Sequence, residues 1–195
     1  MIAEDLLEKY GAILKHYEKN ETLFSEEEVP HFYMQIMKGQ VKMSNYNDEG
    51  KEFVQGVFTD GESFGEPPLF GNFPYPSNAI AVKSTKVWAL PQDIFLKLLE
   101  ENPKVHLEFT ATLAKRLRYK AIMQAEISSN PPEKRVLRLI DYLKEEKEIT
   151  DEYLVPLTRQ QIADMTGLRV ETVIRTIKKL EEEGELKIKD KKVYR

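Results

Sequence analysis

The sequence contains no cysteine among its 195 residues. It therefore cannot form a disulfide, a thiolate zinc site, a cysteine nucleophile or a cysteine-ligated iron–sulfur cluster. Long apolar runs are also missing, because no segment approaches the ~18–20 apolar residues needed to cross a bilayer. The acidic N-terminal segment lacks the pattern of a secretory signal. We expect a cytoplasmic protein with no membrane partner.

The sequence also has little that an active site needs. Its three histidines, His16, His31 and His106, have no paired spacing. A cupin-like metal barrel needs clustered His and carboxylate ligands, and lone histidines are more often surface or core residues. No G-x-S-x-G, phosphate-loop or Rossmann glycine pattern occurs. We therefore expect no catalytic residue, no metal site and no required cofactor.

Charge is unevenly distributed along the chain, whose net charge is −4. Residues 131–195 hold 15 basic and 14 acidic residues, whereas residues 1–130 hold 14 and 19. The acidity therefore belongs to the N-terminal part. An acidic total does not exclude nucleic acid as a partner, because a local basic face decides such binding.

Short apolar segments separated by turn signals fill residues 20–90, with turns at Gly39, Gly50 and Gly61. This rhythm is typical of antiparallel strands in a sandwich or barrel-like roll. The segment before them, 2–17, has apolar residues at helical spacing and is predicted to be a helix. A short helix around 94–99 is predicted to follow the roll.

Residues 104–128 contain no glycine or proline and predict a helix about 37 Å long. Such a helix is too long to bury its apolar face on one small roll, so we expect part of it to form a dimer interface. The alternative is a helix that lies across its own domain. The predicted interface residues lie near one helical stripe, which Leu113 extends: Leu107, Ala111, Leu113, Ala114, Leu117 and Ala121.

Two consecutive prolines, Pro131 and Pro132, mark a linker after this helix, because proline stops a helix and extends the residue before it. We expect an α+β chain in three parts. Residues 1–103 form an N-terminal antiparallel β-roll of the double-stranded β-helix or jelly-roll type, residues 104–130 a long dimerisation helix and hinge, and residues 131–195 a DNA-binding domain.

A helix-turn-helix pattern lies within residues 157–177. Thr158 and Gln161 form a capping box that starts a helix, and Gly167 can take the left-handed conformation of a sharp turn. Ala163 and Val173 belong to a shared core, and the small Ala163 lets a second helix cross closely. An ordinary helix corner is the alternative.

The second helix and the segment after it carry side chains suited to DNA. Arg175 can donate to guanine, Glu171 can accept from cytosine and Val170 can contact a thymine methyl group. The alternative is a Glu171–Arg175 surface ion pair. Alternating apolar and lysine residues after Gly184 predict a two-stranded wing whose lysines contact phosphates. The predicted DNA-contact residues are Thr158, Arg159, Gln160, Arg169, Val170, Glu171, Thr172, Arg175, Lys179, Lys187 and Lys189.

A roll, a long helix, a proline-marked hinge and a winged helix-turn-helix together resemble the CRP/FNR family of bacterial transcription regulators. The segments that carry the resemblance are 32–42, 64–66, 159–163 and 171–175, and the likeness spans nearly the whole chain. It implies an effector-binding roll, a homodimer paired through the long helices, double-stranded DNA as partner, and RNA polymerase as a further partner. The 170–175 segment is closer to the FNR type, although Ile174 stands where that type usually carries serine.

The effector site departs from the family pattern. Pro67 and Pro68 remove two N–H donors from the place where a cyclic nucleotide phosphate would bind, and segment 75–78 lacks the expected arginine. We therefore expect that cyclic AMP is not the effector, whose identity stays unknown. Phe70, Phe73 and Tyr75 line an apolar pocket or fill it. The candidate effector-pocket residues are Gly65, Glu66, Phe70, Ser77, Lys120 and Ala121.

The sequence does not show the operator, the target genes or whether transcription is activated or repressed. One rival function remains open, a regulatory module that uses the winged domain for protein contacts rather than for DNA. Salt-dependent binding to random duplex DNA distinguishes the two.

Overall fold

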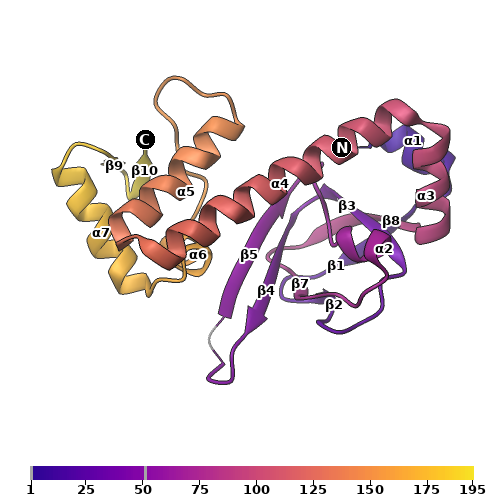
Figure 1. Ribbon diagram of the computed structural model, residues 1–195, viewed down its shortest axis with the longest axis horizontal. Helices are drawn as coiled ribbons and strands as arrows, with labels where there is room; N and C mark the ends of the chain where they lie inside the picture. Colours follow the sequence, from indigo (N-terminus) through magenta and orange to yellow (C-terminus); the bar gives the residue numbers. More distant parts are fainter. Residues whose placement is uncertain (1, 51) are drawn as a thin grey trace. The chain divides into compact units, whose positions relative to one another are not determined.

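The computed structural model describes residues 2–50 and 52–195. The chain divides into two compact units, Met1–Ala114 and Lys115–Arg195. Figure 1 shows their elements. The long helix α4, Pro103–Ser129, contributes residues to both units. The division between the units therefore falls within this helix, at residues 114/115, whereas the sequence places the domain boundaries at residues 103/104 and 130/131.

The N-terminal unit is an antiparallel roll made of two four-stranded sheets. The order of the first sheet is β1-β8-β3-β6, and that of the second is β2-β7-β4-β5. The strands of the first are Ile13–Tyr17 (β1), Thr85–Pro91 (β8), Phe32–Lys38 (β3) and Ser63–Phe64 (β6). Those of the second are Thr22–Phe24 (β2), Asn78–Ala81 (β7), Gln40–Tyr46 (β4) and Glu52–Thr59 (β5). This confirms the predicted roll.

The roll begins with a shorter helix than the sequence predicts. Helix α1 covers only Glu4–Lys9, and Gly11 follows it with a φ of +82°. A glycine in this left-handed conformation ends a helix. Residues 13–17 then pair with β8, with Leu14 opposite Trp88. The expected helix over 2–17 is therefore wrong in its second half, where the apolar spacing belongs to a strand.

Strand β3 separates the two cores of the unit because its successive side chains point to opposite faces. Met34 and Ile36 face the space between the sheets, where the buried cluster is Phe24, Met34, Ile36, Val41, Phe64, Tyr75, Ala79 and Val87. Tyr33 faces the helices instead, and packs with Leu7 of α1 and Phe95 of α3 (Gln92–Glu101). These two helices lie side by side at one end of the roll (Figure 1).

The C-terminal unit holds three helices and a small sheet besides the end of α4. Helix α5, Pro132–Glu146, begins at the second proline of the linker and buries Val136, Leu139 and Ile140. Helices α6 (Arg159–Thr166) and α7 (Val170–Glu182) follow, and then strands β9 (Lys187–Lys189) and β10 (Lys192–Tyr194). Asp190 and Lys191, both with positive φ, form the tight turn that joins these strands. The predicted wing is thereby present.

Gly65 allows an aromatic pair to pack close to the roll's α2 turn, Pro67–Gly71. Its φ is +71°, and a Cβ atom at this position would lie 2.9 Å from the Phe24 ring and 3.2 Å from the Tyr75 ring. Those two rings stack with their centroids 3.6 Å apart. Any side chain at residue 65 therefore strains the backbone and displaces the stack.

Gly65→Ala should lower the stability of the N-terminal unit by about 1–2 kcal/mol for the left-handed backbone, plus about 1–3 kcal/mol for overpacking. Urea unfolding followed by the fluorescence of the single tryptophan, Trp88, measures this loss. Gly61→Ala is the matched control, because Gly61 has a φ of +83° but no atom within 4 Å of the added Cβ. Equal losses in the two variants would contradict the packing role of Gly65.

Candidate nucleic-acid interface

Helix α6 starts at a complete capping box. The Thr158 hydroxyl accepts a hydrogen bond from the Gln161 N–H at 3.1 Å, and the Gln161 side chain accepts one from the Thr158 N–H at 2.8 Å. The helix ends at Gly167, whose φ of +68° is left-handed. The Gly167 and Leu168 N–H groups then both donate to the Ala163 carbonyl. Both ends of α6 are therefore fixed as the sequence predicts.

Helix α7 buries one face and exposes the other. Val173, Ile177 and Leu180 are at most 1% exposed and pack inside the unit. The exposed face carries Glu171, Ile174, Arg175 and Lys178. These positions are spaced i, i+3, i+4 and i+7, so they form one continuous stripe along the helix. The stripe combines a carboxylate, two cations and an apolar side chain.

The base-reading candidates on and just before this stripe form no ion pair within the described part of the chain. Within residues 2–50 and 52–195, neither Arg169 nor Arg175 forms an ion pair, and the alternative Glu171–Arg175 pair is not formed. Both guanidinium groups are exposed. Arginine presents planar N–H donors that match the acceptor edge of guanine. The stripe is thus free to bind a ligand without first breaking an internal ion pair.

The lysines among the predicted contacts have carboxylate partners instead. The Lys179 ammonium lies 2.7 Å from Glu133 of α5 and 3.9 Å from Glu183. Lys187 and Lys189 of the wing both bind Glu152. The Lys179–Glu183 contact is an i,i+4 pair within α7. The other three pairings join residues 35 to 46 positions apart and were not predicted from the sequence.

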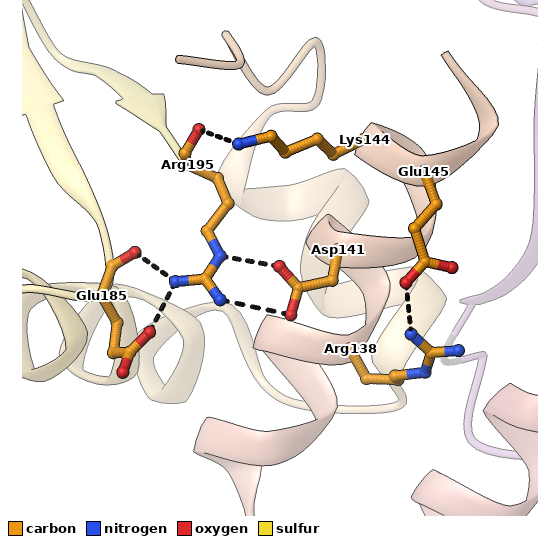
Figure 2. Close-up of polar contacts among 6 residues, drawn as sticks. All are labelled: Arg138, Asp141, Lys144, Glu145, Glu185 and Arg195. Atoms are coloured by element: carbon orange, nitrogen blue, oxygen red, sulfur yellow. Dashed lines mark hydrogen bonds and ion pairs between the residues drawn. The ribbon is translucent and has the colours of Figure 1, made fainter. Parts of the chain in front are cut away.

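Arg195 fixes the wing to the rest of the unit, as Figure 2 shows. Its Nε donates to Asp141 of α5 at 2.6 Å, and its Nη1 donates to the carboxylate and the main-chain oxygen of Glu185. The Lys144 ammonium binds the main-chain oxygen of Arg195 at 3.2 Å. Segment 153–155 lies antiparallel to β10 as an isolated bridge, in which Tyr153 and Arg195 exchange main-chain hydrogen bonds of 2.7 and 2.9 Å. The wing is therefore held by backbone and side-chain contacts alike.

The candidate effector residues divide between the two units. Gly65, Glu66, Phe70 and Ser77 belong to the N-terminal unit, and Lys120 and Ala121 to the C-terminal unit. Glu66 is 2% exposed, and the Ser63 hydroxyl donates to its carboxylate. Ser77 is fully buried, and its hydroxyl has no hydrogen-bond partner within the described residues. The grouping of all six into one pocket stays a prediction.

Known protein families match both units of the chain. The family model of the cyclic nucleotide-binding domain matches residues 14–102, and that of the Crp-like helix-turn-helix domain matches residues 134–194. Over 153 residues the chain is 30% identical to the cAMP-activated global transcriptional regulator CRP of Haemophilus influenzae, an alignment covering 76% of this chain and 68% of that protein. The chain belongs to the CRP/FNR family.

Two further CRP/FNR similarities cover still more of the chain. The transcriptional activatory protein AadR of Rhodopseudomonas palustris is 27% identical over 182 residues, which are 90% of this chain and 75% of AadR. The solved structure of the global regulator CLP of Xanthomonas campestris shares the fold, with a TM-score of 0.75, 20% identity and 98% of each chain covered. The protein is therefore a DNA-binding transcription regulator of the CRP/FNR type and not an enzyme.

In this CRP/FNR regulator the predicted DNA-contact residues lie on the surface. Arg159, Val170 and Thr172 are half-buried, and the other eight are exposed. Gln160 binds Asp164 at 2.7 Å. The exposed stripe adds two residues that were not chosen from the sequence, Ile174 and Lys178. Their spacing of three and seven from Glu171 was the signal that could have identified them.

Residues 2–50 and 52–195 contain no group of three or more His, Asp and Glu side chains that could hold a metal ion. None of the helices in this part of the chain is long and apolar enough to span a membrane.

Proposed function

We propose that this regulator acts as a cytoplasmic homodimer that binds a pseudo-palindromic operator. In this proposal α7 reads bases in the major groove and the wing contacts phosphates. The observation that carries it is the exposed stripe on α7, where neither Glu171 nor Arg175 forms an ion pair within the described residues. Related half-sites would lie about one helical turn, ~34–36 Å, apart. The family resemblance adds RNA polymerase as a partner.

The proposed dimer uses the exposed apolar residues of α4. Leu107 is 72% exposed and Leu117 is 70% exposed. Ala111, Ala114 and Ala121 are exposed as well. Side chains of this kind on one stripe favour a second copy of the helix as their partner. Leu113 is less suited to this role, because it packs partly against the core of the N-terminal unit.

The proposed regulation does not use cyclic AMP. Pro67 and Pro68 occupy the first two positions of α2, where a phosphate would need N–H donors. The Tyr75 ring next to this turn is 3% exposed and stacks on Phe24 between the sheets. Both features argue that this part of the roll is filled by its own side chains. The effector, if one exists, is of another kind.

Arg175→Ala tests the base-reading role. Operator sites are first selected from random duplex DNA with the unaltered protein, and affinities are then measured for a selected site and for random DNA. Arg175→Ala should relax the preference for guanine at one position in each half-site. The expected loss is about 1–3 kcal/mol of discrimination against the other bases for each bidentate contact removed. Lys187→Ala or Lys189→Ala should weaken binding to all DNA sequences by the same factor and reduce the slope of log affinity against log salt concentration.

If Arg175→Ala lowered the affinity for operator and for random DNA by the same factor, Arg175 would instead be a phosphate contact. If the unaltered protein showed no salt-dependent binding to any duplex, the winged domain would serve protein contacts. The operator proposal would then fail.

Leu117→Glu tests the dimer. A charge in the middle of an apolar interface has no partner and loses hydration, so the protein should shift towards monomer. Sedimentation velocity at low protein concentration measures the shift. Leu117→Met keeps an apolar side chain of similar size and should remain dimeric. A sedimentation coefficient that Leu117→Glu leaves unchanged would refute this interface.

Calorimetry with cyclic AMP tests the effector proposal. We expect no binding heat at micromolar nucleotide. Micromolar binding that is lost in Glu66→Ala would instead show that residues 64–66 and the α2 turn bind the nucleotide despite Pro67 and Pro68. The argument from the missing N–H donors would then be wrong.

A further inference from the structure

Glu152 binds both lysines that the wing offers to DNA. Lys187 and Lys189 are two residues apart on β9, so their side chains extend from the same face of the strand. The Glu152 carboxylate lies 3.2 Å from the Lys187 ammonium and 2.7 Å from the Lys189 ammonium. Lys189, and then Lys187, hold the pKa of Glu152 below its usual value. The carboxylate is therefore charged at neutral pH.

This three-residue cluster, which we call the Glu152 clamp, is not what holds the wing together. Strands β9 and β10 pair through their main chains. Tyr153 and Val155 form further main-chain hydrogen bonds with Arg195 and with Val193 of β10. Arg195 ties the same sheet to Asp141 and Glu185 (Figure 2). The clamp side chains remain exposed to water, with 37% of the Glu152 side chain and 67% of the Lys187 side chain accessible. The clamp can open without unfolding the wing.

A carboxylate in this position competes with DNA phosphates. A lysine ammonium that binds a phosphate has to break or weaken its ion pair with Glu152. The charged Glu152 carboxylate that is left beside the duplex then repels the negatively charged phosphates. Phosphate contacts supply affinity without sequence information. Competition for the two lysines should thus weaken binding to every sequence by the same factor. Arg175, which has no carboxylate partner among the described residues, is not subject to this competition.

We propose that Glu152 is an intramolecular competitor of the DNA phosphates, which lowers the affinity of the wing for duplex DNA and leaves its sequence preference unchanged. This inference rests on the proposed function, because it requires that Lys187 and Lys189 contact phosphates.

Glu152→Gln removes the negative charge and keeps the shape of the side chain. The variant should bind random duplex DNA and the selected operator about two- to fivefold more tightly at low salt, the range expected for exposed ion pairs. The slope of log affinity against log salt should become steeper by up to about one unit. Glu182→Gln is the matched control, because Glu182 is exposed on α7 and forms no ion pair within the described residues. It makes the same charge change at a carboxylate that forms no ion pair with Lys187 or Lys189.

The two lysines supply the second half of the test. In a Lys187→Ala/Lys189→Ala background, Glu152→Gln should bring no gain beyond that of Glu182→Gln. Thermal unfolding of each variant shows whether the C-terminal unit is intact.

The outcomes separate the two proposals. If the lysine double variant binds DNA more weakly but Glu152→Gln gains no more than Glu182→Gln, the competition is refuted and the wing contact stands. If the lysine double variant binds like the unaltered protein, the wing contact itself fails, and the competition fails with it. A gain confined to the operator would also refute the inference, since phosphate competition does not depend on sequence.

Discussion

The outward face of α7 depends on how its other face is buried. Val173, Ile177 and Leu180 leave the helix only one orientation in which all three avoid water. The turn at Gly167 fixes where the helix begins, and the capped α6 gives it a surface to cross. Because a helix repeats every 3.6 residues, this burial alone decides that Glu171 and Arg175 point to solvent. The proposed base contacts are thus a consequence of the core of the C-terminal unit.

Features encoded by neighbouring residues could be predicted from the sequence. The Thr158 capping box, the left-handed Gly167, the proline linker and the Asp190–Lys191 turn each follow from a few adjacent positions. The prediction failed at residues 13–17, where pairing with β8 overrides a helical spacing that Gly11 has already interrupted. Sequence reasoning also missed the bond between Glu152 and the wing lysines, because 35 and 37 residues separate the partners.

The roll of this regulator is packed with aromatic side chains. Phe24 lies between Phe64 and Tyr75 in a stack that Gly65 makes room for. Burial, together with the negative charges of Glu28 and Glu66, raises the pKa of Tyr75 to about 12. The Tyr75 phenol therefore stays neutral in the physiological range and serves as an apolar surface. The stacked rings of Phe24 and Tyr75 therefore form part of the buried core between the two sheets.

The N-terminal and C-terminal parts of helix α4 pack against different cores. Phe109 packs with Tyr33 and Phe95 in the N-terminal unit, whereas Tyr119 packs on Tyr142 of α5, with ring centroids 4.6 Å apart. The proline linker is consequently a poor place to divide the gene into separately expressed halves. A fragment that ends there would carry an uncovered Tyr119, and its complement would lack the aromatic cover of α5. Dissection of this protein into folded pieces has to begin the C-terminal piece inside the long helix.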